Sequence, residues 1–317
     1  MPLTRSDIPT LLTPGLRTLF FKALSELTVE DYLKIATIAP SGASQETYPW
    51  LGQAPSVREW KDERIPKGLA EQKYTIINKL WEASIGVDRT AIEDDQYGQI
   101  KLRIQELAEK VIRHRNRLIF NLLRDGGADG AGLCYDGQYF FDSDHSDEGS
   151  ASQSNSGTAG GAIGTVALTS ATLWAAIAAM QAFTDAQGEI LDIQPDTLVV
   201  PPKLEQTARE ILESDYGYSA TSLGGATTMA KNTLKGRLSL IVTPHCATTA
   251  RTSSWFVLDT SGVVKPTILQ ERVPVSFDAL EGNSENGFMR DQYFYGIRAR
   301  YNAGYGMWQK AYGSFVA

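Results

Sequence analysis

The sequence predicts an α+β protein, and three features of its pattern support this class. Residues 96–124 have the apolar periodicity of one long amphipathic helix, and residues 73–81 alternate as a β-strand does. Residues 165–262 mix helical and strand patterns, whereas the residues after them show mainly strand patterns. Helical and strand segments that occupy separate parts of a chain are typical of α+β proteins.

A short helical pattern at 16–24 opens the chain, and an extended β-hairpin is predicted at 57–91. Within it, residues 73–81 alternate and are rich in β-branched side chains, which favours a strand. Residues 65–70 contain a proline and a glycine and fit the partner edge or the turn. Because a two-stranded hairpin is marginal alone in water, we expect it to lie on another copy of the chain.

The long helix at 96–124 is predicted by apolar residues at spacings of three, four and seven, which keep one face in line. It follows acidic residues 93–95 and ends before Gly126 and Gly127, in agreement with the preferences of helix termini. At the rise of an α-helix it extends about 40 Å. The residues that form its apolar face are Ile100, Ile104, Leu107, Val111, Leu118 and Leu122.

After the long helix, residues 148–164 are small and polar, which is the composition of a surface loop. Thr169 or Ser170 is then expected to cap a helix, and Pro202 to open a second one. The strands expected in this part of the chain are 197–200, 238–242 and 293–301.

Length and composition exclude several classes of protein. The 317 residues exceed what one compact core usually holds, so two domains are expected. No apolar run approaches the roughly 20 residues of a membrane helix, and the N-terminus lacks a signal-peptide core. The net charge of −7 argues against a dedicated nucleic-acid binder, although not against a protein that encloses nucleic acid. Cys134 and Cys246 form no disulfide framework and fit a reducing cytoplasm.

The most distinctive string reads Leu-Cys-Tyr-Asp-Gly-Gln-Tyr-Phe-Phe-Asp-Ser-Asp-His and spans residues 133–145. Its Asp136-Gly137 pair predicts a hairpin with a type I′ turn. The same string closely resembles the major head subunit of Mu-like tailed phages. The resemblance covers nearly the whole chain and extends to residues 35–41, 46–52, 58–60, 87–89 and 92–98, in the same order.

This resemblance implies the Hong Kong 97-type capsid fold, whose parts correspond to the predicted elements. Residues 1–56 would be the N-terminal arm, 57–91 the hairpin called the E-loop, and 165–262 the α/β axial domain. Residues 92–164 and 263–317 would form the peripheral domain, which is built on a long spine helix.

The resemblance also implies a structural role rather than an enzymatic one. Hexamers and pentamers of the chain would assemble into an icosahedral head shell around double-stranded DNA, which they enclose without sequence-specific binding. No catalytic residue, cofactor or metal is expected, and the protein would be found in the virion after assembly in the bacterial cytoplasm. A separate scaffolding protein, a portal and a decoration protein are implied as partners. Because the arm signals begin soon after Met1, neither a scaffolding segment nor proteolytic maturation is expected.

Particular side chains are expected to carry this assembly. The E-loop would bury its aromatic residues on a neighbouring subunit, and the basic run near the end of the spine helix would face DNA. Isopeptide cross-links through the lysines of the hairpin are not expected, because no desolvated partner is evident. The interface residues would be Trp50, Arg58, Trp60, Lys73, Tyr74 and Trp81, and the DNA-facing residues Arg113, Arg115 and Arg117.

Two alternatives remain open from the residues. The first is a metal-dependent hydrolase that uses an acidic cluster, although this cluster fails the calcium-loop template and is better explained as a solvated loop end. The second is an encapsulin-like compartment shell, which shares the fold and would bind a protein cargo instead of DNA. The residues of the acidic cluster are Asp142, Asp144, His145, Asp147 and Glu148.

Overall fold

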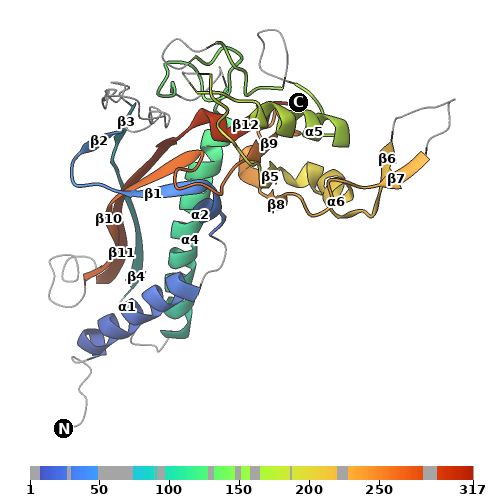
Figure 1. Cartoon of the computed structure of the whole chain (residues 1–317). Helices are drawn as coiled ribbons and strands as arrows, with labels where there is room; N and C mark the ends of the chain where they lie inside the picture. Colours follow the sequence, from blue (N-terminus) through green and yellow to red (C-terminus); the bar gives the residue numbers. More distant parts are fainter. Residues whose placement is uncertain are drawn as a thin grey trace.

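The computed structural model shows two four-stranded β-sheets beside a long helix, with two two-stranded sheets and shorter helices around them (Figure 1), and it confirms the predicted mixture of helix and sheet. The structure describes residues 8–26, 30–48, 74–88, 90, 97–127, 132–146, 151–157, 165–185, 188–219, 228–280 and 291–316.

The spine helix α4 (Tyr97–Arg124) agrees closely with the helix predicted from periodicity. Its apolar face is buried, with Ile104 and Leu107 no more than 4% exposed. After the helix, a Cβ atom on Gly126 would lie 2.9 Å from Cδ2 of Phe141, so only glycine fits this approach. The helix therefore ends where the chain must pass closely under an aromatic ring.

The long sheet lies beside α4 and has the strand order β1-β10-β11-β4. Strand β1 pairs in parallel with β10, whereas the other two pairings are antiparallel. The alternation predicted along β11 is confirmed, because Tyr293, Tyr295 and Tyr301 are all buried. The strands are β1 (Ala36–Pro40), β10 (Thr267–Leu280), β11 (Gln292–Tyr305) and β4 (Lys79–Asp88).

The structure corrects the prediction that residues 57–91 form a hairpin without a core of its own. Strand β4 pairs with β11 from Lys79 to Asp88, and it therefore belongs to the long sheet. Strand β3 (Tyr74–Ile77) pairs instead with β2 (Gln45–Tyr48), which comes from the predicted N-terminal arm. Local alternation predicted these strands, but it could not identify partners that lie far away in sequence. Residues 57–73 of the predicted E-loop and residues 49–56 of the predicted arm lie outside the described residues.

The short sheet has the strand order β12-β9-β5-β8 and forms the centre of the predicted axial domain. Every residue of β5 and β9 is buried, which explains their continuous apolar sequence. The last strand, β12, pairs with β9, so the chain after residue 263 contributes to both sheets rather than to a peripheral domain alone. The strands are β5 (Thr197–Val200), β8 (Ser239–Val242), β9 (Trp255–Leu258) and β12 (Ala311–Ser314).

Two helices accompany the short sheet. Helix α5 (Ser170–Gln181) begins with a capping box, in which the Thr169 side chain accepts the N–H of Thr172 and the Thr172 side chain accepts that of Thr169. Pro202 opens a second helical segment as predicted, first as a 3-10 turn and then as α6. The bounds of this segment are η2 (Pro202–Leu204) and α6 (Glu205–Glu213), and a two-stranded sheet follows with β6 (Tyr216–Ser219) and β7 (Thr228–Lys231).

The turn at Gly137 differs from the predicted type I′ hairpin. Its backbone bond runs from the Gly137 N–H to the Cys134 carbonyl at 3.2 Å, so Tyr135 and Asp136 are its central residues. Only Gly137 has a positive φ, of 84°, whereas a type I′ turn requires positive φ at both centres. The turn is therefore one residue earlier than predicted, and glycine supplies the left-handed residue that follows it.

Near its N-terminal end, α4 packs against α1 (Ile8–Glu26) and the far part of the long sheet. Leu16 and Phe20 of α1 are fully buried there, and the Phe20 ring stacks on Phe277 at 5.3 Å. This forms a second, smaller core. None of the helices in the described part of the chain has the length and hydropathy needed to cross a membrane.

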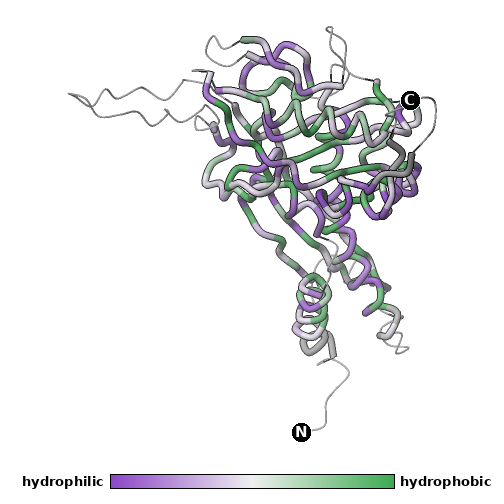
Figure 2. The backbone as a smooth tube through the Cα atoms, turned by 45° about the vertical axis from the view of Figure 1, so that its right-hand side comes forward, coloured by the Kyte–Doolittle hydropathy of each residue, from purple (hydrophilic) through white to green (hydrophobic). Residues whose placement is uncertain are grey.

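The main hydrophobic core is continuous between the two sheets. Phe141 joins them, because its ring lies 5.3 Å from Phe256 of the short sheet, while the adjacent Phe140 stacks on Tyr305 of the long sheet at 4.5 Å. Hydrophobic residues, green in Figure 2, are concentrated in the strands in the middle of the chain trace. The remaining short elements are α2 (Asp31–Ile35), η3 (Pro244–Cys246) and η4 (Trp308–Lys310).

Candidate functional site

Two of the predicted interface residues, Tyr74 and Trp81, lie in described strands and contact their own chain. The Tyr74 hydroxyl oxygen accepts the backbone N–H of Tyr305 at 2.9 Å, and burial raises the pKa of Tyr74 to about 12. The Trp81 indole N–H donates to the carbonyl of Tyr301 at 2.9 Å. Part of each side chain is therefore buried within its own subunit, and a contact of the exposed part with a neighbouring subunit stays a prediction. Trp50, Arg58, Trp60 and Lys73 lie outside the described residues, and their interface role stays a prediction.

The three arginines predicted to face DNA have different environments. The Arg115 side chain is only 13% exposed, forms an ion pair with Glu271 and lies 5.1 Å from the centre of the Tyr301 ring. This corrects the prediction for Arg115, because an arginine held in this way is not available to a phosphate. Arg113 and Arg117 are exposed, and Arg113 pairs with Glu109 at 2.8 Å.

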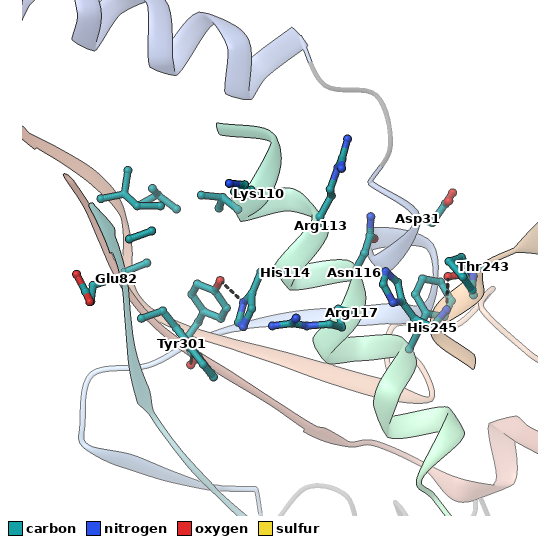
Figure 3. Close-up of a pocket in the computed structure, with 18 of the residues that line it drawn as sticks. Asp31, Glu82, Lys110, Arg113, His114, Asn116, Arg117, Thr243, His245 and Tyr301 are labelled. Atoms are coloured by element: carbon teal, nitrogen blue, oxygen red, sulfur yellow. Dashed lines mark hydrogen bonds between the residues drawn. The ribbon is translucent and has the colours of Figure 1, made fainter. Parts of the chain in front are cut away.

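A cavity of about 700 Å³ lies between α4, the long sheet and η3. Trp81 of β4 and Tyr301 of β11 line its sheet side, and His245 lines the opposite side. Figure 3 shows His114 and Arg117 of α4 beside Tyr301, with His245 beyond Arg117. Much of the cavity wall is apolar, so His114, Arg117 and His245 lie against a poorly solvated surface.

The polar groups of the cavity influence one another. Tyr301 and His114 form a hydrogen bond of 2.8 Å between the hydroxyl oxygen and Nδ1, and the Trp81 ring lies 4.3 Å from His114. Burial and the positive charges of Arg117 and Arg115 lower the pKa of His114. Burial, followed by Arg117 and Arg124, lowers the pKa of His245. Both rings are therefore predominantly neutral near pH 7, and Arg117 acts on both of them.

The acidic string predicted as a solvated loop end contains one fully buried residue, His145. Its Nδ1 lies 2.6 Å from Oδ2 of Asp136, and both side chains are 0% exposed. The ring stacks on Trp308 with a centroid distance of 4.1 Å. The prediction is therefore wrong for His145 but holds for the exposed Asp144. Asp147 and Glu148 lie outside the described residues.

Asn155 fixes the protonation of the other nitrogen of His145. Its Nδ2 donates to the carbonyls of Phe140 at 2.7 Å and Trp308 at 3.2 Å, while its Oδ1 accepts the N–H of Asp142 at 2.9 Å. Because Oδ1 also faces His145 Nε2 at 3.2 Å, that nitrogen must carry a proton. Because Nδ1 contacts Asp136, both ring nitrogens of His145 have a partner within the protein.

This network has the residue types of a hydrolytic dyad but not the accessibility of one. Asp136 and His145 have no exposed side-chain surface on which a substrate could approach. Burial also raises the pKa of the Cys246 thiol to about 12, so its neighbour His245 has no thiolate to pair with. Within the described residues, no group of three or more His, Cys, Asp and Glu side chains is placed to hold a metal ion.

Sequence reasoning missed Asn155 and Trp308 as partners of His145, and Glu271 as the partner of Arg115. Asn155 lies in the stretch interpreted as a polar surface loop, yet it is fully buried. Composition could not predict the burial of Asn155, because a Ser/Asn/Gly-rich segment has the same local sequence whether one of its asparagines is buried or exposed to water.

The sequence model of the family described as "Mu-like prophage major head subunit gpT" matches residues 10–166, 162–246 and 247–316 of this chain. The chain is 27% identical over 283 residues to the "Mu-like prophage FluMu major head subunit" of Haemophilus influenzae, covering 89% of this chain and 65% of that protein. It is 34% identical over 145 residues to the "Major capsid protein" of Escherichia phage Mu, covering 46% of each chain. The chain thus spans less than two thirds of the length of these two curated relatives.

Among solved structures, the fold matches a subunit from the procapsid of bacteriophage JBD30 with a TM-score of 0.57 and 31% sequence identity. That match covers 99% of this chain and 77% of the phage subunit. The architecture predicted from the resemblance is therefore confirmed as that of a phage capsid subunit. Because the family model covers almost all of the sequence, this chain belongs to the family of Mu-like prophage major head subunits, gpT.

Proposed function

We propose that the chain is the shell-forming subunit of a phage or prophage head that encloses double-stranded DNA. The match of the gpT family along nearly the whole chain carries this proposal, and the likeness to a procapsid subunit agrees with it. A structural function is supported by the family, which is named for a head subunit, and by the likeness to a procapsid subunit.

The proposed mechanism is geometric. Copies of the chain form closed rings of five and six through heterologous contacts, in which one surface of a subunit meets a different surface of the next. Arg58, Trp60 and Lys73 of the E-loop contact the neighbouring subunit, together with Trp50 of the arm. Buried aromatic residues supply most of the energy of such contacts. The exposed parts of Tyr74 and Trp81 extend the same contact.

A shell of this kind has further partners. A separate scaffolding protein guides assembly, a portal occupies one vertex, and a decoration protein binds the outer surface. The particle assembles in the bacterial cytoplasm and remains as the virion head. Arg113 and Arg117, which are exposed on α4, face the enclosed DNA.

Electron microscopy of the purified full chain tests shell formation. We expect closed shells, tubes or rings, because the subunit contacts are built into the chain. A protein that stays monomeric by analytical ultracentrifugation up to high concentration, alone and with its scaffolding protein, would contradict the proposal.

A second measurement separates a DNA-filled head from a compartment that takes protein cargo. Particles isolated from lysed host cells are treated with nuclease and then opened. We expect protected double-stranded DNA inside them. Particles that contain a defined protein and no protected DNA would favour the compartment alternative.

A further inference from the structure

The spine helix has a charge opposite to that of the whole chain. It contains seven basic and two acidic side chains, whereas the chain has a net charge of −7. Several of the basic groups already have an anionic partner. Lys110 pairs with Glu106 at 3.2 Å and Arg113 with Glu109 at 2.8 Å. The other paired residues are Arg103 with Glu106, Arg115 with Glu271 and Arg124 with Asp125.

Arg117 differs from these residues, because the described part of the chain offers it no carboxylate partner while its side chain is exposed at the cavity. His114 precedes it by three residues, so both side chains project from the same face of α4. His245 reaches the same cavity from η3, which packs against α4. Arg117 thus lies between the two histidines in this cavity of about 700 Å³ (Figure 3).

We propose that Arg117, His114 and His245 form a phosphate-binding corner that takes a backbone phosphate of the double-stranded DNA enclosed by the shell. This inference rests on the proposed function. It assigns the contact with DNA phosphate to one arginine and two histidines, whereas the basic run of α4 alone does not define which side chains make that contact. The apolar wall behind the corner strengthens the attraction, because an ion pair beside a poorly solvated surface is less screened than one in water.

The hydrogen bonds at the corner fit an anion. When the Tyr301 hydroxyl donates to Nδ1 of His114, the proton of that imidazole lies on Nε2 and is available to a phosphate oxygen. The planar guanidinium of Arg117 presents two parallel N–H groups, which match two oxygens of one phosphate. The positive charge of Arg117 would thereby face one phosphate of the DNA backbone.

Phosphate binding at this corner is coupled to proton uptake. Both histidines are predominantly neutral in the empty site, and a bound dianion or diester favours their charged forms. Binding therefore tightens as the pH falls. The other charged or titratable groups at the cavity are Lys110 and Arg113 of α4, Asp31 of α2, Glu82 of β4 and Tyr301 of β11, of which Asp31 and Glu82 oppose the anion.

The test uses the full chain before assembly and a fluorescent 24-base-pair duplex, roughly two helical turns of B-DNA. Anisotropy titrations at several salt concentrations compare the wild type, Arg117→Gln and Arg103→Gln. Arg103 is the matched control, because it is an exposed arginine of the same helix and does not line the cavity. We expect Arg117→Gln to weaken binding by about tenfold and to lower the salt slope by about 0.9, the value for one lost phosphate contact.

A second set of titrations compares pH 7.5 with pH 6. We expect the wild type to bind more tightly at pH 6 and the double variant His114→Gln/His245→Gln to lose most of this difference, while Arg103→Gln keeps it. Inorganic phosphate serves as a separate probe, since competition with the duplex locates the site at a phosphate.

Equal affinity and salt slope for Arg117→Gln and Arg103→Gln would overturn the phosphate corner, as would phosphate binding without any effect on the duplex. An acidic peptide that competes at the cavity while DNA does not would assign the site to a protein partner instead. Electron microscopy of Arg117→Gln keeps the two proposals separate. Intact shells with weakened DNA binding support the corner, whereas a wild type that never assembles contradicts the proposed function alone.

Discussion

At the scale of single residues, His145 shows how a polar cluster serves the fold rather than a reaction. Its ring is stacked on Trp308, paired with Asp136 and bonded to Asn155, so residues 132–146 and 151–157 are fixed to each other and to the residues before β12. Groups buried this completely contribute only while every partner is present. Substitution of a single side chain in this network is therefore expected to lower the free energy of unfolding strongly.

Replacing His145 with alanine removes the ring that pairs with the buried Asp136 carboxylate, which then keeps the backbone N–H of Gln138 as a hydrogen-bond donor. We expect the free energy of unfolding to fall by about 3–5 kcal/mol, the usual cost of breaking a buried ion pair from one side. Urea denaturation of the unassembled subunit measures this change. Asp144→Ala, one position earlier and exposed, is the control and should change the free energy by less than about 0.5 kcal/mol. Similar values for the two variants would show that the network is not as closed as described.

The two cavity histidines predict a dependence of stability on pH. Burial and nearby arginines lower the pKa of His114 and of His245 below the value of about 6.5 expected in the unfolded chain. The unfolded state therefore binds more protons between the folded and unfolded pKa values, and the free energy of unfolding decreases as the pH falls through this window. Denaturation of the unassembled subunit from pH 7.5 to 5.5 tests the sign, and His114→Gln/His245→Gln should flatten the curve. A stability that rises on acidification over this range would refute the assignment.

At the scale of elements, the close approach of β12 to the end of α4 depends on glycine. A Cβ atom on Gly313 would lie 2.8 Å from the Phe141 ring, which is also 2.9 Å from the Cβ position of Gly126. The ring is thus held between a strand of the short sheet and the end of the spine helix. This contact connects the two halves of the main core.

Gly313→Ala should therefore force the Phe141 ring to move. We expect a loss of about 1–3 kcal/mol in the free energy of unfolding, as is typical of an overpacked core. Gly42→Ala is the matched control, because nothing lies within 4 Å of its Cβ position. Thermal unfolding of both variants provides the comparison, and an unchanged midpoint for Gly313→Ala would mean that Phe141 relaxes freely.

The sequence predicted those elements whose pattern is local. Regular spacing of apolar residues located α4, and strict alternation located β11, because both periods are set by backbone geometry alone. The partner of β4 was missed, since it pairs with a strand about 200 residues later and no local pattern records that choice. The burial of Arg115 was missed for the same reason, as its partner Glu271 lies on β10. At the candidate site, the basic run was evident from sequence, whereas His245 joins it only through folding.

At the scale of the whole molecule, we expect the rest of the chain to fold when the segment between β2 and β3 is replaced by a short turn. Tyr48 and Tyr74 are paired across antiparallel strands, so a two-residue Asn-Gly turn can replace residues 49–73 and close β2 and β3 into a hairpin. We expect this variant to fold with nearly unchanged stability and to form no shells by electron microscopy, because the removed residues are the ones we propose to contact a neighbouring subunit.

Trp81→Ala provides the contrast within the same predicted E-loop. Its indole is bonded to Tyr301 within one chain, so this variant should lose stability as an isolated subunit. Intact shells from the variant without residues 49–73 would show that the E-loop contact is not essential. A large loss of subunit stability in that variant would show that the segment belongs to the fold.

The order of strands in the long sheet has a consequence for synthesis on the ribosome. Its two edge strands, β1 and β4, are made early, whereas the central pair, β10 and β11, is made among the last residues of this sequence. A nascent chain consequently holds both edges without the strands that join them, and the sheet closes only after β11 has been made. Truncated products should lack this sheet and be open to proteases. The topology thus makes the closed sheet a sign that synthesis has passed β11.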